Sequence, residues 1–269
     1  MAADQSLQAG VQQAWFMFYD SNGDPSGKTT TALANAASAG AYRLRGIQEM
    51  STGIPEADAV PIPGDDIVLG NILFSSDAPR EFVVNMGQMD LTLDAEMQNS
   101  LVETVGEAKM GVIDLSSLVL ATGALIVQGK AIIDGLPGYS GWVYPLVQLQ
   151  PLNRENFSGR TAGVIRYKGV AQPAFNRPWG TTIVNKSGSE ISAYALPFTT
   201  RGGPLTMHAF RGGITSFTLD KGPISVAKSP SYSDKVALTV SSISVVTRLL
   251  TLSAAVVAGR PGMVVYEYT

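Results

Sequence analysis

The stretch LVLATGALIVQGKAIIDGLPGYSGWVYPLVQLQ (residues 118–150) carries the pattern that decides the fold. Short apolar runs rich in β-branched and aromatic residues, bounded by glycine or proline, are typical of β-strands. The stretch predicts strands at Leu118–Gln128, Ala131–Ile133 and Trp142–Gln150, with a turn at Gly138–Gly141. The centre of the chain is therefore expected to be β-structure.

The same pattern extends from this stretch towards both ends of the chain. On the N-terminal side, VQQAWFMFY (Val11–Tyr19) and YRLRGI (Tyr42–Ile47) predict strands. Further strands are predicted at Ile67–Phe74, Glu81–Met86, Gly111–Leu115, Thr161–Val170, Thr181–Asn185, Ile191–Phe198, Ile214–Leu219, Val236–Val246, Leu249–Val257 and Met263–Tyr268. Many short strands with turn signals between them indicate a mainly β fold, a sandwich or a barrel.

Two segments predict helices within this β-rich chain. The alanine-rich segment Thr30–Ala39 predicts a short helix. The segment Asp94–Val105 predicts an amphipathic helix that Asp94 caps and Gly106 ends. Its apolar face repeats every four residues, at Met97, Leu101 and Val105, and is expected to pack on the sheet.

Residues 51–66 predict an extended loop or an edge segment, because proline removes the backbone donor that a strand ladder needs. The residues that set this loop apart are Pro55, Pro61, Pro63, Gly64, Asp65 and Asp66.

The composition limits the classes of function. Of the 269 residues, 45% are hydrophobic and only 15% are charged, so disorder is not expected. The 19 Lys and Arg residues against 22 Asp and Glu residues give a net charge of −3, too few cations for sequence-independent DNA binding. The absence of cysteine excludes disulfides, thiolate metal sites and a cysteine nucleophile. The N-terminus resembles no signal peptide, and no apolar run is long enough for a membrane span, so a soluble protein made in a cytoplasm is expected.

The segment Asn22–Thr29 approaches a phosphate-binding loop. In such loops glycine amides surround the phosphates and a Lys-Thr pair reaches phosphate and Mg²⁺. The residues in question are Gly23, Gly27, Lys28 and Thr29, and Asp114 could serve as a second, Walker-B-like group. The first glycine of the motif is replaced by Asn22, and a β-rich chain lacks the alternating strands and helices of such enzymes. A polar turn after a strand is the simpler interpretation.

Other chemical sites have weaker patterns. The spacing Asp20-x-Asn22-x-Asp24 begins like a calcium loop, but Pro25 and Thr31 stand where glycine and glutamate are needed. His208 is the only histidine, so a zinc site is not expected and a structural histidine is the simpler interpretation. Glycoside hydrolysis would need a pair of acidic residues, but turns and helix caps explain the acidic clusters of this chain. The clusters consist of Asp65, Asp66, Asp77, Asp90, Asp94, Glu96, Glu103 and Glu107. No catalytic group, metal site or cofactor site is predicted.

Aromatic and arginine residues alternate between residues 142 and 179. They are Trp142, Arg154, Phe157, Arg160, Arg166, Tyr167, Phe175, Arg177 and Trp179, with Tyr144 among them. Such residues form nucleic-acid or sugar-binding platforms, and subunit interfaces favour them too.

The segment Tyr42–Gly106 resembles the core of the phage major tail tube proteins. The resemblance rests on Tyr42–Ile47, a proline-bearing loop to Gly64-Asp65-Asp66, a strand from Leu69-Gly70 to Phe74, a strand to Met86, and Met89-Asp90-Leu91 before a helix closing near Gly106. Later segments, Arg160–Tyr167 and Ala174–Gly180, resemble that family as well. The resemblance implies a tail-tube β-sandwich or barrel over residues 1–200. Residues 201–269 form a β-rich C-terminal segment that extends or completes the same domain.

The resemblance implies a structural virion protein and no enzyme. Such subunits join their sheets into a barrel in hexameric rings, and the rings stack into a tube that conducts DNA during ejection. The implied partners are further copies of the chain, the tape-measure protein and other tail proteins, with DNA passing the lumen without specific binding and no membrane involved. In this family the loop at 51–66 would reach a neighbouring subunit or ring. Three alternatives stay open: another β-rich virion protein (neck, capsid decoration or fibre), a P-loop-like nucleotide-binding protein, and a carbohydrate-binding β-sandwich.

Overall fold

The protein is described here from a computed structural model. The model describes residues 7–8, 12–29, 31–44, 49–52, 57–62, 67–69, 72–74, 81–86, 89–96, 108–109, 112–113, 121–151, 164–177, 182–226, 231–232, 239–255, 258 and 261–269. Over these residues the chain is mainly β, with antiparallel sheets and a single helical turn, α1 (Ala32–Asn35). The predicted β-rich class is therefore confirmed.

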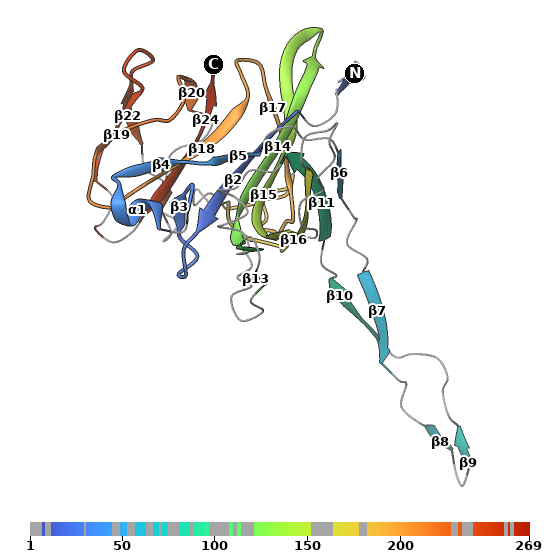
Figure 1. Cartoon of the computed structure of the whole chain (residues 1–269). Coiled ribbons are helices and arrows are strands. Elements are labelled where there is room, and N and C mark those ends of the chain that lie inside the picture. Colours follow the sequence, from blue (N-terminus) through green and yellow to red (C-terminus); the bar gives the residue numbers. More distant parts are fainter. Residues whose placement is uncertain are drawn as a thin grey trace.

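The largest sheet, called the main sheet below, curls into a half-barrel (Figure 1). Its strand order is β3 (Pro25–Gly27), β2 (Gln13–Tyr19), β14 (Ala121–Ile133), β15 (Leu136–Pro151), β16 (Val164–Ala171), β11 (Met89–Glu96) and β6 (Glu49–Thr52). Three more strands join it at the sides: β1 (Leu7–Gln8) pairs with β14, β5 (Tyr42–Leu44) with β2, and β17 (Leu196–Thr200) with β15.

Two further sheets come largely from the C-terminal part. The second sheet has the order β20 (Pro223–Val226), β24 (Gly262–Tyr268), β18 (Leu205–Phe210) and β4 (Ser38–Gly40), and β21 (Ser231–Tyr232) also pairs with β24. The outer sheet has the order β19 (Ser216–Thr218), β23 (Leu249–Leu252) and β22 (Val240–Ile243). The suggested boundary at residue 200 falls between β17 and β18, which lie in different sheets.

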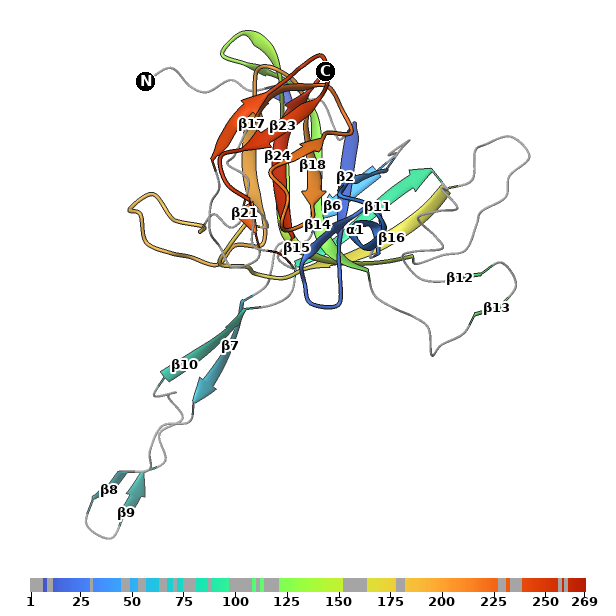
Figure 2. The same cartoon turned by 90° about the vertical axis from the view of Figure 1, so that its left-hand side faces the viewer.

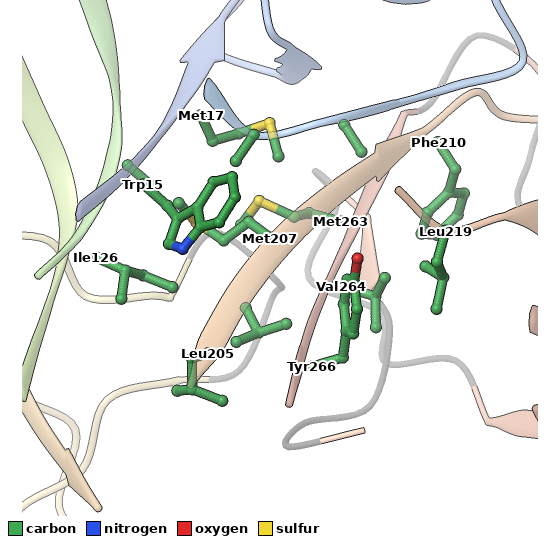
Figure 3. Packing of buried hydrophobic residues seen from close by; sticks show 14 of the residues in the cluster. Trp15, Met17, Ile126, Leu205, Met207, Phe210, Leu219, Met263, Val264 and Tyr266 are labelled. Atoms are coloured by element: carbon green, nitrogen blue, oxygen red, sulfur yellow. The ribbon is translucent and has the colours of Figure 1, made fainter. Parts of the chain in front are cut away.

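Strand β2 of the main sheet is buried on both faces, which explains why its residues 14–19 are all apolar or aromatic. Side chains of β2 alternate: Trp15 and Met17 face the second sheet, whereas Phe16 and Phe18 face the inside of the curl. The first group joins residues of β18 and β24 in the first core, seen in Figure 3. The second group forms a separate core inside the curl with Leu125, Tyr144, Val147, Leu149 and Tyr167.

The hairpin β14–β15 corrects one prediction from the central stretch. Gly138–Gly141 form no turn; they lie within β15, and the chain reverses at Asp134-Gly135, where both residues have positive φ. Asp-Gly is a preferred pair for such two-residue hairpin turns. Gly141 is required for another reason, since a Cβ there would lie 2.0 Å from the carbonyl oxygen of Val127 on β14. Because the chain reverses only at Asp134-Gly135, β14 continues to Ile133 and β15 begins at Leu136, so β15 is much longer than the predicted strand Trp142–Gln150.

Both helix predictions need correction. The segment from Thr30 to Ala39 has only the turn α1, because Ser38–Gly40 form strand β4 against β18. The amphipathic helix does not begin at Asp94, because Asp94–Glu96 end strand β11, where Asp94 pairs with Arg166 of β16. Met97, Leu101 and Val105 lie outside the described residues, so the packing of that helix on the sheet stays a prediction.

The buried amide of Gln128 connects the main sheet to the second sheet. Its Nε2 donates to the Leu205 carbonyl oxygen at 2.7 Å, and its Oε1 accepts from the Leu205 N–H at 2.8 Å. The side chain is fully buried and imitates one rung of a strand ladder. It therefore satisfies two backbone groups at the start of β18 that water cannot reach.

Replacing Gln128 by alanine is expected to lower the free energy of unfolding by about 2–4 kcal/mol, because two buried backbone groups would lose their partners. The matched control is Gln12→Ala, whose exposed side chain should cost no more than about 0.5 kcal/mol. Urea unfolding followed by tryptophan fluorescence measures both. Equal stability of the two variants would contradict the bridging role of Gln128.

Candidate functional site

The most conspicuous functional candidate is an arm that extends from the body of the molecule (Figures 1 and 2). We define the arm as residues 57–86, with the hairpin β7 (Ala57–Ile62)–β10 (Glu81–Met86) and the hairpin β8 (Ile67–Leu69)–β9 (Ile72–Phe74). The strands β7 and β10 form six residue pairs, from Ala57 with Met86 to Ile62 with Glu81. Within the described part of the chain, the arm strands pair with one another and with no strand of the body.

The arm is inserted between β6 and β11, the last two strands in the order of the main sheet. The chain enters it after β6 and returns from it into β11, and these two strands pair from Asp94 with Glu49 to Leu91 with Thr52. β6 is the terminal strand of the curled sheet along its main path, and β3 together with β5 ends the other side. Terminal strands present unpaired backbone groups that another chain can pair with. Among the described strands β6 has β11 as its one partner, so the arm lies next to a terminal strand of the sheet.

The loop predicted at residues 51–66 overlaps the first part of this arm, and two of its stretches are strands: residues 51–52 end β6, and Ala57–Ile62 form β7. Pro61 lies in β7, opposite Phe82 of β10, so it belongs to a strand that has one partner among the described strands. A proline is tolerated there because its missing donor can point away from the ladder. Pro55, Pro63, Gly64, Asp65 and Asp66 lie outside the described residues.

A small two-stranded element, β12 (Ala108–Lys109) with β13 (Val112–Ile113), lies between the arm and the central hairpin in sequence. The suggested Walker-B-like Asp114 directly follows β13 and lies outside the described residues.

The suggested phosphate loop is the turn of an antiparallel hairpin. The residues after the turn form β3, which pairs with β2 instead of opening a helix. The amides of Asn22 and Asp24 both donate to Oδ1 of Asp20, at 2.8 and 2.9 Å, so they already have an acceptor. Gly23 and Gly27 both have positive φ, and Gly27 also lies against Ala39. The geometry is that of the polar turn, and the same contacts use Asp20, which the calcium pattern would need as a ligand.

Lys28 instead belongs to a group of cations around Asp220. Its Nζ lies 2.8 Å from Oδ2 of Asp220. Arg248 Nη1 donates to the backbone oxygen of Asp220 at 2.9 Å, and Lys221 follows directly in sequence. Arg211 lies close by in the fold: its guanidinium donates to the carbonyl oxygens of Leu33, Ala34 and Ala36 at the end of α1, next to β4. We call Lys28, Arg211, Lys221 and Arg248 the basic patch.

His208 is buried next to this patch, in β18. Its ring stacks on Phe217 with 5.8 Å between centroids and 3° between planes. Among the described residues neither ring nitrogen has a hydrogen-bond partner. Burial lowers the pKa of His208 to about 4, the Asp220 carboxylate opposes that shift, and Lys28 adds to it. The ring is therefore neutral near pH 7 and is a packing residue of the first core.

A cleft of about 300 Å³ lies between β17 of the main sheet and β24 of the second sheet. Its lining includes Arg177, Glu267 and the apolar side chains of Leu196, Phe198 and Val265. Burial lowers the pKa of Arg177. This size is at the lower end of the range for small-molecule sites.

Of the aromatic residues between 142 and 179, some are buried and others are exposed. Tyr144 and Tyr167 are buried in the core inside the curl, and burial raises the pKa of Tyr144 to about 12. Trp142 and Phe175 are 43% and 60% exposed. For Tyr144 and Tyr167 strand alternation explains the aromatic pattern, because both lie on the inner face. Arg154, Phe157, Arg160 and Trp179 fall outside the described residues.

The described residues include no group of three or more His, Cys, Asp or Glu side chains that could hold a metal ion. Among the same residues, no helix is long and apolar enough to cross a membrane. No family model, no curated protein and no solved structure matches the chain.

Sequence reasoning predicted a loop at residues 51–66 and strands at Ile67–Phe74 and Glu81–Met86, but not the arm that contains them, and it missed the basic patch. The members of that patch lie far apart in sequence, at residues 28, 211, 221 and 248, so no local motif marks them. A signal that could have pointed to it is the sign of the charge in each part of the chain, which reverses near residue 200.

Proposed function

We propose that the protein is a tail tube subunit of a phage virion. In this proposal its copies form hexameric rings that stack into the conduit for DNA during ejection. The observation that carries the proposal is the arm next to a terminal strand of the curled sheet. A two-stranded hairpin is marginally stable in water on its own. An arm of two such hairpins outside the body is thus expected to be held by another molecule.

The curled main sheet supports the same function. A half-barrel leaves terminal strands whose backbone groups need partners, and joining the sheets of neighbouring copies into a closed ring provides them. A contact between unlike surfaces of successive rings then continues without a natural end, which produces a tube. The tail-tube type of β-sandwich, with the helix near residues 97–105 on the sheet, belongs to this proposal.

The charge of the chain suits a DNA conduit. A net charge of −3 disfavours tight retention of phosphate by the lumen. In this proposal the protein is made in the host cytoplasm and is located in the tail of the virion. Its partners are copies of itself, the tape-measure protein and other tail proteins.

The test is the assembly state of the purified chain. Light scattering over a range of concentrations should show growth into large particles, and negative-stain electron microscopy should show six-fold rings and tubes of constant diameter. Single rings that do not stack would favour a neck protein, and tapered or solid fibres a fibre protein. A monomer that persists at every concentration, also with the tape-measure protein added, would overturn the proposal.

A further inference from the structure

The charge of the chain is divided unevenly. Residues 201–269 carry seven Lys or Arg and three Asp or Glu, a net charge of +4. Residues 1–200 carry twelve and nineteen, a net charge of −7, and the two parts sum to the −3 of the whole chain. The arm alone, residues 57–86, carries five acidic residues and one arginine, a net charge of −4; these are Asp58, Asp65, Asp66, Asp77, Glu81 and Arg80.

The basic patch gathers the positive charge at one surface. Lys28, Arg211 and Arg248 are exposed and Lys221 is half-buried, whereas the acidic residue in contact with them is Asp220. Counted together with Asp220, the four cations of the patch leave a net charge of +3. Lys28 binds the Asp220 carboxylate and Arg248 binds the Asp220 backbone oxygen, and the carboxylate lies against Gly40, where a Cβ would be 2.2 Å from Oδ2. Lys28 and Arg248 are exposed, whereas the Lys221 Nζ lies 6.0 Å from the centre of the Trp15 ring and Arg211 binds carbonyl oxygens of α1.

An exposed apolar turn lies beside this charge. Val245 and Val246 are 58% and 92% exposed in the connection between β22 and β23, and Leu249 next to Arg248 is 40% exposed. A charged patch with apolar side chains beside it is the composition of a protein-binding surface. The arm offers matching chemistry, because its strands combine acidic residues with the apolar sequences ADAVPI and EFVVNM.

The arm and the basic patch cannot meet within one chain. In Figure 1, α1, β4 and β19 lie on one side of the body, and the arm leaves from the other side and points away. The two surfaces differ from each other, so a contact between them joins copies head to tail and does not close on itself as a pair. The geometry and the charge thus fit an intermolecular contact.

We propose that the acidic arm of one copy docks on the basic patch of a neighbouring copy. This inference rests on the proposed self-assembly and names the two surfaces that meet in it. Lys28, Lys221 and Arg248 attract the carboxylates of the arm, and the turn at Val245-Val246 covers apolar side chains of its strands. Opposite charges across such a contact speed association and select the partner.

Charge reversal with rescue tests the contact. The variant Lys28→Glu/Lys221→Glu reverses the patch, and Asp58→Lys/Glu81→Lys reverses the arm. Each is expected to slow assembly, measured by light scattering, by about tenfold or more. The chain with all four substitutions should regain most of the rate, which a misfolded variant cannot do. The control Lys130→Glu/Lys186→Glu changes the same charge at exposed lysines outside the patch and should assemble normally.

The assembly rate of the fourfold variant shows whether the arm or another molecule binds the basic patch. If the fourfold variant assembles no faster than the two reversed variants, the arm is not the partner of the patch. If reversal of the patch leaves assembly unchanged but releases DNA or another tail protein, the patch serves that ligand and the inference is wrong.

A second measurement does not need tubes, and it separates failure of the inference from failure of the proposed function. Because the chain has no cysteine, Asp58→Cys and Lys221→Cys variants can form only the disulfides that are introduced. Oxidation of their mixture should yield the mixed dimer, well above the yield of Asp58→Cys mixed with Lys186→Cys. Equal yields would overturn the docking contact even if the chain forms tubes, and a preferred mixed dimer without tubes would count against the proposed function alone.

Discussion

Replacing residues 57–86 by a short glycine-serine linker is expected to abolish tube formation and to leave the body folded. Among the described strands, those of the arm pair only with one another, so the loss costs the body no strand partner. The linker can connect β6 to β11 because these strands are antiparallel partners.

The measurement combines thermal unfolding with electron microscopy. The variant should unfold cooperatively, with a midpoint within a few degrees of the natural chain, and should show no tubes at concentrations where the natural chain forms them. The control is a linker of the same composition inserted between Asn185 and Glu190, an exposed turn of the body. Tubes formed by the arm-deleted chain would contradict the role of the arm in assembly.

Replacing His208 by phenylalanine is expected to remove most of the acid sensitivity of the fold between pH 7 and pH 5. The pKa of His208 falls from 6.5 in the unfolded chain to about 4 in the folded one. Between these values the unfolded chain binds the proton and the folded chain does not, so stability falls as pH falls. The natural chain should lose about 2 kcal/mol of its free energy of unfolding from pH 7 to pH 5 through this residue.

Phenylalanine suits this position because the imidazole stacks on Phe217 and its nitrogens contact no partner among the described residues. The residue is the only histidine in the chain, and carboxylates titrate mainly below pH 5, so the window isolates it. Asp220 and Lys28, the charged groups near the ring, are retained in the variant. Denaturant unfolding at both pH values measures the difference. Equal losses in the two proteins would show that His208 is not the group responsible.

The strands were predictable where one residue pattern dominates. Most of VQQAWFMFY became β2 (Gln13–Tyr19), because a strand buried on both faces needs an apolar run such as residues 14–19. The segment Met263–Tyr268 became β24 for the same reason, with all its residues buried except Glu267. Turns were harder: glycines at Gly138 and Gly141 suggest a reversal, but they are needed where backbones of neighbouring strands come close.

The predicted helix start at Asp94 was wrong because the four-residue spacing of Leu93 and Met97 fits both the 3.6-residue period of a helix and the two-residue period of a strand. Asp94 pairs with Arg166 and Glu49 in the main sheet, a tertiary contact that no local pattern shows. Sequence motifs could not predict the basic patch for a similar reason. The folded chain brings Lys28 to Asp220 across more than 190 positions of sequence, and only the fold reveals that contact.

The two ends of the chain meet in the first core, and this affects when the protein can fold. Trp15 packs edge to face against Tyr268, and the Tyr268 hydroxyl donates to Oε1 of Gln13 at 2.7 Å. Strand β4, near the N-terminus, completes the second sheet only when β18 has been made. During synthesis the early strands must therefore wait for residues 262–268 to leave the ribosome before their core can close. In the proposed assembly, the second sheet beside the basic patch would be complete only after translation of β24, which would separate synthesis from polymerisation in time.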